Sequence, residues 1–309
     1  MKKVFIDGGA GTTGLRIVER LSARDDISLI VLPDAVRKDI NARKEALNAS
    51  DIAFLCLPDA AAIEAVSLIE NENTVVIDTS TAHRTKEGWT YGFPELVGKE
   101  AIAASKRIAN PGCHASGFVA LVAPLVRAGL LSPDAALTAF SLTGYSGGGK
   151  GMIAEYEAEE RSALLGAPRQ YGMKQAHKHL PEMAKLAGLT KKPLFTPIVA
   201  DFYSGMEVTV PLYTDMLACE GKDALGVIEG IYRATYTGKV VTFDAGDENG
   251  FLSAAALSGS DAMTVSVYGN DERIVLVARF DNLGKGASGA AIQNMNLSLG
   301  CDEIAGLSL

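Results

Sequence analysis

Near its amino terminus the chain reads Val4-Phe5-Ile6-Asp7-Gly8-Gly9-Ala10-Gly11-Thr12-Thr13-Gly14, three apolar residues that run into a glycine-rich turn. The apolar run predicts a buried strand, and apolar residues then recur at helical spacing from Leu15 to Leu21. A GxGxxG pattern, formed by Gly9, Gly11 and Gly14, therefore lies between a predicted strand and a predicted helix. This is the context in which the pattern indicates dinucleotide binding.

The glycine-rich turn offers what a pyrophosphate needs. A tight turn, a close approach of the backbone and amide groups at a helix N-terminus all favour bound negative charge. We therefore expect Gly9, Gly11, Thr12, Thr13 and Gly14 to bind the cofactor. The alternative is a cluster of glycines that serves only as a turn.

Charged residues near the end of the second predicted strand bear on the choice of cofactor. Asp34 has about the spacing at which an acid hydrogen-bonds the ribose of NAD. Arg37 and Lys38 follow within one turn and can pair with the 2′-phosphate of NADP. Because two cations outweigh one acid for a dianionic group, we favour NADP. Ordinary charges on a solvated loop are an equally good interpretation of any one of these residues.

Alternating strands and helices extend through the first third of the chain. Continuous apolar runs at 27–32, 52–57 and 74–77 are typical of buried parallel strands, so this part predicts a doubly wound α/β sheet. After Cys113 a long apolar helix at 116–130 is followed by strand-like runs, which indicate a second domain with a mixed or antiparallel sheet. These runs are 137–142, 206–212, 264–268 and 273–280. From Asn282 a glycine- and alanine-rich segment opens a final helix, which we expect to return to the first domain.

Bulk composition excludes several classes of partner. The 309 residues carry a net charge of −8, which argues against nucleic acid or an anionic membrane as the main partner. The most apolar stretch, 117–131, is interrupted by Arg127 and is too short to span a bilayer, and the first residues lack a signal peptide's apolar region. The four cysteines form no CxxC pair, so we expect reduced thiols in a cytoplasmic protein.

One cysteine stands in a distinctive turn. Asn110-Pro111-Gly112-Cys113-His114-Ala115-Ser116-Gly117-Phe118 leads into the apolar helix and places Cys113 at or just before its N-terminus. Unpaired amides and the positive end of the helix dipole favour a thiolate there, and the same amides can form an oxyanion hole. A thiolate can attack an acyl group, and the resulting thioester accepts hydride. A small buried cysteine is the better interpretation of Cys56 and is adequate for Cys219 and Cys301.

Two of the four histidines precede a predicted helix in His177-Lys178-His179-Leu180-Pro181-Glu182. Pro181 predicts an extended Leu180, which would place both imidazoles on one face. One of them can act as general acid/base, with Glu182 holding the imidazolium. The alternatives are a zinc site, disfavoured because CxxC and HExxH are absent, and a histidine that only caps or packs. We expect no metal, and structural or supporting roles for His83 and His114.

Together these motifs resemble the N-acetyl-gamma-glutamyl-phosphate reductases, in their shorter second type. The resemblance extends to the segment Asn282-Leu-Gly-Lys-Gly-Ala-Ser-Gly-Ala-Ala-Ile-Gln-Asn-Met-Asn and covers nearly the whole chain. It implies NADPH-dependent reduction of N-acetyl-gamma-glutamyl phosphate to the semialdehyde in arginine biosynthesis. It also implies the architecture of aspartate-semialdehyde dehydrogenase: an NADP-binding Rossmann domain over 1–112 and 282–309, and an inserted α+β catalytic and oligomerisation domain over 113–281.

The resemblance further implies roles for individual residues. Cys113 is the nucleophile, and the pair His177 and His179 holds the acid/base. Arg84 corresponds to an arginine of the family and is our candidate for binding a substrate anion. His83 occupies a position where the family usually has an apolar residue. Ser146 and Lys150 lie in a glycine-rich loop that resembles the family's substrate loop, and Asn282 is expected at the cofactor. The implied assembly is a homodimer or homotetramer.

Several activities fit this chemistry. Aspartate-semialdehyde dehydrogenase and the reductase of carrier-linked α-aminoadipate would use the same thioester with a different substrate arm. A Rossmann NADP sensor without catalysis is the alternative from another class. Formation of an acyl thioester on Cys113 would exclude the sensor.

Overall fold

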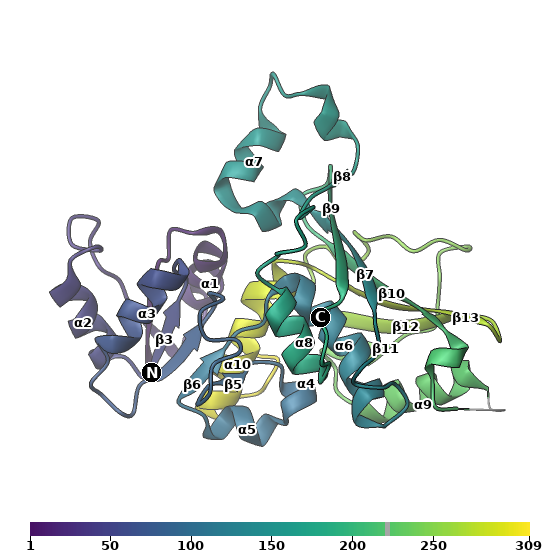
Figure 1. Ribbon diagram of the computed structural model, residues 1–309. Coiled ribbons are helices and arrows are strands. Elements are labelled where there is room, and N and C mark those ends of the chain that lie inside the picture. Colours follow the sequence, from purple (N-terminus) through teal and green to yellow (C-terminus); the bar gives the residue numbers. More distant parts are fainter. Residues whose placement is uncertain (220–222) are drawn as a thin grey trace. The chain divides into compact units, whose positions relative to one another are not determined.

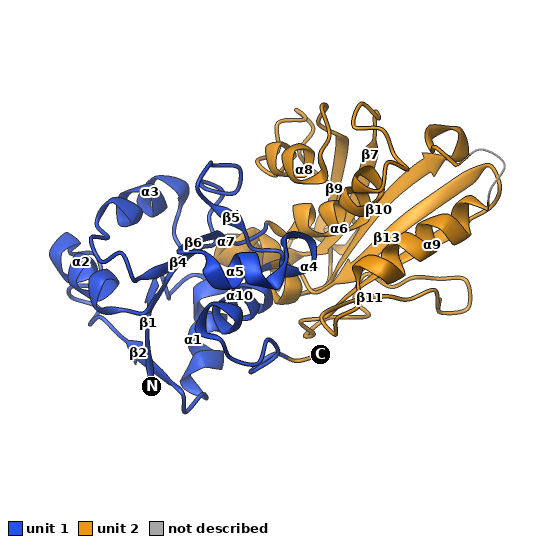
Figure 2. Cartoon of the chain, turned by 90° about the horizontal axis from the view of Figure 1, so that it is seen from below, with its two compact units in different colours: residues 1–111, 287–307 blue, residues 112–286, 308–309 orange. Residues whose placement is uncertain are grey.

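The computed structural model describes residues 1–219 and 223–309 and divides into two compact units. Unit 1 comprises Met1–Pro111 and Ala287–Leu307, and unit 2 comprises Gly112–Gly286 with Ser308–Leu309 (Figure 2). Within the described ranges, no helix has both the length and the hydropathy that a membrane span requires.

Unit 1 is built on a six-stranded sheet in which every pairing is parallel. The strand order is β2-β1-β3-β4-β6-β5, so it reverses between β1 and β3, next to the glycine-rich turn. Such a reversal is where open α/β sheets bind ligands, beyond the carboxyl ends of the strands. The strands are β1 (Lys2–Asp7), β2 (Ile27–Ile30), β3 (Ile52–Leu55), β4 (Val75–Asp78), β5 (Thr90–Tyr91) and β6 (Arg107–Ala109).

Helices cover both faces of this sheet (Figure 1). Because side chains alternate along a strand, Ile52 and Phe54 of β3 enter one core while Ala53 and Leu55 enter the other. The first core contains α1 (Thr12–Ser22), α5 (Lys99–Ala104) and α10 (Gly289–Leu299), and the second contains α2 (Ile40–Ala49) and α3 (Asp59–Ser67). The predictions of a doubly wound sheet and of a carboxyl-terminal helix that returns to it are confirmed.

Unit 2 contains a mixed seven-stranded sheet in the order β11-β12-β13-β10-β7-β9-β8. Long antiparallel pairings join β13 to both β10 and β12, whereas β7 runs parallel to β9. The mixed sheet agrees with the sequence-based expectation. The strands are β7 (Thr138–Gly144), β8 (Arg169–Gln170), β9 (Leu194–Ala200), β10 (Met206–Tyr213), β11 (Val241–Phe243), β12 (Met263–Gly269) and β13 (Arg273–Phe280).

Helix α6 (Cys113–Arg127) is the central helix of unit 2 and packs on β10 and β13. Its residues from His114 to Leu125 are all buried, and at Gly117 an added Cβ would lie 2.6 Å from Val208 Cγ2. Pro124 has no N–H for the carbonyl of Ala120, and the hydroxyl of Tyr236 donates to that carbonyl instead, at 2.6 Å. Close packing on the sheet therefore holds α6, and with it Cys113, in a defined position.

The described residues of unit 2 also form the α-helices α7 (Gly149–Glu157), α8 (Leu180–Ala187) and α9 (Ala224–Thr235). Helix α8 packs on α6, and α9 contacts α6 and β12. A short π-helical turn, Gly284–Ser288, precedes α10.

Candidate active site

Cys113 is the first residue of α6, as the turn before it predicted. Gly112 precedes the helix with φ −80° and ψ 142°, and it has no side chain with which to cap the amides of the first turn. The amide of Gly112 itself donates to Glu182 Oε1 at 2.8 Å. Cys113 therefore lies at the positive end of a buried helix, whose uncapped first-turn amides are groups that can bind an oxyanion.

Three histidines lie together in unit 2. The ring centroids of His177 and His179 are 4.8 Å apart and nearly perpendicular, and the ring of His114 lies 5.4 Å from the first and 5.6 Å from the second. His179 is buried, whereas His177 is half-buried. Burial, aided by the charge of Lys178, lowers the pKa of His177, which favours the neutral base form at neutral pH.

The expected extended conformation at Leu180 is wrong. Leu180 is the first residue of α8, His179 before it has φ −83° and ψ −12°, and Lys178 and His179 lie in a turn. A proline in the first turn of a helix lacks only an amide that has no partner there, so Pro181 is tolerated without forcing its neighbour out of the helix. The two imidazoles meet because the chain turns, with the His179 amide donating to His177 Nδ1 at 3.2 Å.

Glu182 is buried in the first turn of α8 and accepts from the backbone of the cysteine turn. The sequence did not indicate this contact, which joins residues 70 positions apart. It ties the segment before Cys113 to the helix that follows the histidines. The proposed pairing of Glu182 with an imidazolium stays a prediction.

His114 has closer contacts than its expected supporting role suggested. Its Nδ1 lies 2.7 Å from Ser141 Oγ and its Nε2 lies 2.7 Å from the hydroxyl of Tyr171. Burial lowers the pKa of His114 to about 3, with smaller contributions from the charges of His177 and Lys178. Sequence reasoning missed Ser141 and Tyr171, since a serine in a strand and a tyrosine in a loop carry no signal of their own.

The glycine-rich turn of unit 1 has the geometry of a phosphate cradle. Gly8 has φ +85°, and an added Cβ there would lie 2.3 Å from the carbonyl oxygen of Cys56. At Gly14 an added Cβ would lie 2.7 Å from Gly8 O, so the helix packs directly on the turn. Helix α1 begins at Thr12 after Gly11, which has no side chain to cap the first amides. The sequence reading included Gly9 and Gly11 but overlooked Gly8, the residue with positive φ.

A cavity of about 440 Å³ extends from this turn along the carboxyl ends of β1 and β2. Asp34, Arg37 and Lys38 line it together with Gly8 and Gly9, and Arg37 Nε lies 3.3 Å from Asp34 Oδ1. Arg43, which the sequence reading overlooked, also lines the cavity, is buried and bonds Asp7. The turn and the amides at the start of α1 therefore fit the pyrophosphate of a dinucleotide, with the cations close by.

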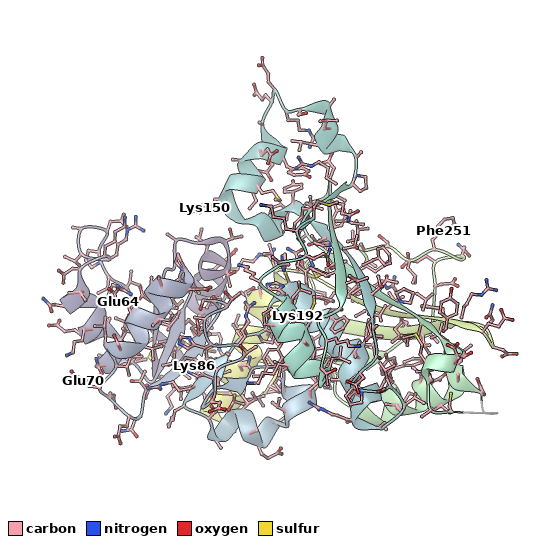
Figure 3. The ribbon with its side chains drawn as sticks, in the orientation of Figure 1. Glu64, Glu70, Lys86, Lys150, Lys192 and Phe251 are labelled. Carbon is pink, nitrogen blue, oxygen red and sulfur yellow. The ribbon has the colours of Figure 1, made fainter. Side chains whose placement is uncertain are left out.

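Four further residues expected at ligands are placed as follows. Arg84 of unit 1 donates to the carbonyl oxygens of Asn110 and Thr79. Asn282 of unit 2 is buried, donates to Ser146 Oγ at 3.0 Å and accepts from the amide of Gly205. Lys150 is exposed on α7, where Figure 3 labels it. Their expected roles at cofactor and substrate stay predictions.

Other reactive groups fit structural roles. None of the four cysteines is in a disulfide, and burial raises the pKa of the Cys56 thiol to about 12. His83 is buried, lies 2.6 Å from Asp78 Oδ2 and stacks on Trp89. In the part of the chain that the structure describes, no cluster of three or more His, Cys, Asp or Glu side chains is arranged to hold a metal ion.

Comparison with known proteins places this site in a family. Residues 3–105 match the model of the semialdehyde dehydrogenase NAD binding domain, and residues 113–282 match that of the semialdehyde dehydrogenase dimerisation domain. N-acetyl-gamma-glutamyl-phosphate reductase 2 of Nostoc sp. is 43% identical, with 99% of each chain covered. The reductase of Chelativorans sp. is 47% identical, over 96% of this chain and 98% of the relative. The chain belongs to the N-acetyl-gamma-glutamyl-phosphate reductase family. The resemblance inferred from its motifs is thereby confirmed.

Solved structures agree on the fold of this reductase family member. Aspartate semialdehyde dehydrogenase II from Vibrio cholerae superposes with a TM-score of 0.72 at 17% identity, covering 97% of this chain and 98% of that one. The aspartate semialdehyde dehydrogenase of Candida albicans, solved with NADP, has a TM-score of 0.65 at 15% identity, with 96% and 98% covered. The predicted aspartate-semialdehyde-dehydrogenase-like fold and a nicotinamide-dinucleotide domain are confirmed.

Proposed function

We propose that this protein uses NADPH to reduce N-acetyl-gamma-glutamyl phosphate to N-acetylglutamate semialdehyde and phosphate, in arginine biosynthesis. The observation that carries the proposal is the position of Cys113, the first residue of a buried helix in the same unit as His177 and His179. Relatives that bear the reductase name match almost the entire chain at 43–47% identity and support the substrate.

The first half of the reaction forms a thioester. His177, whose lowered pKa leaves it neutral at pH 7, takes the proton of the Cys113 thiol on Nδ1, and the hydrogen bond from the His179 amide to that nitrogen breaks. The sulfur then bonds to the γ-acyl carbon, and the bond from that carbon to the phosphate oxygen breaks. Amides at the start of α6 bind the oxyanion while it exists.

The second half reduces the thioester. When bound, the dinucleotide supplies a hydride to the acyl carbon. The imidazolium of His177, which holds the proton from the cysteine, stabilises the oxygen of the thiohemiacetal. Breaking the carbon–sulfur bond then releases the aldehyde and returns the Cys113 thiolate.

The cofactor is proposed to be NADP rather than NAD. Gly9, Gly11, Thr12, Thr13 and Gly14 would hold the pyrophosphate, and Arg37 and Lys38 would pair with the 2′-phosphate. Both cations line the unit 1 cavity, and Asp34, the acid next to them in the sequence, already lies 3.3 Å from Arg37. An acid paired in this way is a weaker partner for the ribose hydroxyl. Asn282 is proposed to support the cofactor site through the loop that it ties to Ser146.

The substrate's anionic groups are proposed to bind Arg84, Ser146 and Lys150. The Lys150 ammonium is exposed, as a phosphate ligand requires, and Ser146 lies in the same glycine-rich loop. We further propose functional domains at 1–112 with 282–309 and at 113–281, a cytoplasmic location, and a homodimer or homotetramer formed through the second domain. The dimerisation-domain model that matches 113–282 supports the assembly.

One experiment tests the function. Purified protein is given NADP⁺, phosphate and N-acetylglutamate semialdehyde, and NADPH formation is followed by absorbance. We expect turnover that depends on phosphate and is absent in Cys113→Ser. Faster turnover of aspartate semialdehyde would overturn the substrate assignment. Cofactor binding without turnover of either aldehyde would favour a sensor.

A further inference from the structure

A chain of three buried or half-buried polar side chains lies beside the nucleophile, and the steps above do not use it. His114 follows Cys113 on α6, Ser141 lies on β7, and Tyr171 comes just after β8. Both hydrogen bonds of the imidazole are 2.7 Å long, and the ring is 4% exposed. A histidine that is hydrogen-bonded at both ring nitrogens has a fixed orientation. Its tautomer therefore determines which group donates and which accepts in each of the two hydrogen bonds.

The hydrogens in the two bonds of His114 can be placed by requiring that every buried donor has an acceptor. His114 is neutral at physiological pH because burial lowers its pKa to about 3, so one ring nitrogen donates and the other accepts. Among the residues that the structure describes, the Ser141 hydroxyl bonds only His114. If Nδ1 donated to it, the serine proton would be buried without an acceptor, at a cost of about 1–3 kcal/mol. Ser141 therefore donates to Nδ1, and Nε2–H donates to the oxygen of Tyr171.

This direction leaves the Tyr171 proton available to a ligand. Within residues 1–219 and 223–309, His114 is the only hydrogen-bond partner of the tyrosine oxygen. The Tyr171 ring centroid lies 6.1 Å from that of His177, so the tyrosine lies beside the three histidines of the site. Burial, with a smaller effect of charge at Cys113, raises the pKa of Tyr171, so the phenol keeps its proton and can donate it while its oxygen accepts from His114.

We propose that Tyr171 is a further catalytic residue whose hydroxyl donates a hydrogen bond to the acyl oxygen of the Cys113 adduct, and that His114 and Ser141 are positioning residues that direct this proton. The inference rests on the thioester chemistry of the proposed function. No proton is transferred from the tyrosine, which adds a further hydrogen-bond donor to the oxygen that the α6 amides and the His177 imidazolium already stabilise. Its effect is greatest when that oxygen carries negative charge.

Tyr171→Phe tests the donor without changing the shape of the ring. We expect kcat to fall on the order of 10²-fold, as for the loss of one oxyanion donor, with KM for the dinucleotide unchanged. Tyr156→Phe is the matched control, since this tyrosine packs in the same apolar cluster and its hydroxyl bonds Arg169. The control should keep wild-type kcat. Wild-type kcat in Tyr171→Phe would overturn the proposal.

The rate of Cys113 alkylation by iodoacetamide, measured against pH, shows whether the Tyr171 hydroxyl donates to the acyl oxygen or to the Cys113 thiolate. If Tyr171 serves the acyl oxygen, Tyr171→Phe leaves the alkylation pKa unchanged while kcat falls. A raised alkylation pKa would mean that the hydroxyl stabilises the thiolate, and it would overturn the assignment to the acyl oxygen.

A double-mutant cycle tests the positioning residues. Ser141→Ala removes the donor that sets the tautomer, and we expect a smaller loss of kcat, on the order of 10-fold. Combined with Tyr171→Phe it should add no further loss, because both act through one hydroxyl. His114→Leu should behave in the same way. If His114→Leu fails to fold, the result with Ser141→Ala alone decides whether these residues position Tyr171. If the kcat losses of the single variants multiply in the double variant, the proposal that Ser141 and His114 act through Tyr171 is overturned.

All variants are assayed with N-acetylglutamate semialdehyde and with aspartate semialdehyde. The aldehyde that the wild type oxidises decides the proposed function. The ratio of variant to wild type on that aldehyde decides the role of Tyr171, so the two failures are distinguishable.

Discussion

At the scale of single residues, the chemistry depends on where Cys113 stands in its helix. The thiol lies at the start of α6, whereas Cys56 lies beyond β3 in unit 1, where burial raises its pKa to about 12. A thiolate forms readily only where nearby dipoles and a base favour it, so residue type alone does not identify the nucleophile.

Cys113→Ser should abolish reductase activity, by at least roughly 10³-fold, while NADPH still binds. A serine hydroxyl is rarely ionised, and its ester accepts hydride less readily than a thioester. Activity by absorbance and cofactor affinity by fluorescence titration check both halves of the prediction. Retention of substantial activity would mean that another residue is the nucleophile.

His177→Asn should lower turnover by ~10²–10⁴, the range expected for a lost general acid/base, with little change in cofactor affinity. His179→Asn should cost less and act partly through stability, because His179 is buried whereas His177 is half-buried. Burial lowers the pKa of His177. The base form that accepts the cysteine proton should therefore be lost only at a pH below about 6.5, the approximate pKa of an ordinary histidine.

The pH–rate profile distinguishes the two histidines. His177→Asn should remove the limb that titrates in this range, and His179→Asn should keep it. If the profile flattens in His179→Asn instead, the two roles must be exchanged.

Reversing Arg37 and Lys38 to glutamate should weaken NADPH binding far more than NADH binding. Each lost charge-assisted contact is worth roughly 1.5–3 kcal/mol, on the order of tenfold or more in affinity. Dissociation constants for both cofactors provide the measurement, and Lys86→Glu, at an exposed lysine outside the residues that line the cavity, is the control. Equal use of NADPH and NADH by the wild type would make Asp34 the residue that matters.

At the scale of elements, helix α6 gives the cysteine its rigid support. The helix is buried from His114 to Leu125, and the hydroxyls of Tyr232 in α9 and Tyr236 just after it bond the carbonyls of Leu121 and Ala120 near Pro124. The cost of a proline inside a helix is thereby reduced, and the start of the helix keeps its position.

Gly117→Ala should destabilise unit 2 by about 1–3 kcal/mol and lower kcat, because its Cβ would lie 2.6 Å from Val208 and displace α6 from the sheet. Gly151→Ala is the matched control, since α7 leaves open space there and alanine favours a helix. Urea unfolding and steady-state kinetics measure the two effects. Wild-type stability in Gly117→Ala would contradict the close packing of α6.

At the scale of the whole molecule, the sheet of unit 2 has a covered face and an open one. Helices α6 and α9 cover the face that contains Val208, whereas Phe140 of β7 points from the other face and is 43% exposed. Thr209 pairs with Phe140 across the strands and shares that face. The proposed homo-oligomer would bury it.

Phe140→Asp should therefore shift the protein toward monomers. A charge buried without a partner costs several kcal/mol, so the dissociation constant of the assembly should rise about 100-fold or more. Analytical ultracentrifugation gives the mass, with Leu164→Asp, an exposed leucine outside the sheet, as the control. An unchanged mass would place the assembly surface elsewhere.

The sequence alone determined the doubly wound sheet, the second mixed sheet and the position of Cys113 at a helix start. These follow from local signals, namely strand and helix periodicity and the glycine and proline turns, which act over a few residues. Only the tertiary structure decided that Gly112 bonds Glu182, that His114 joins Ser141 to Tyr171, and that Leu180 is helical. Those contacts join residues 27 to 70 positions apart, or depend on which amides already lack partners, and no local pattern encodes them.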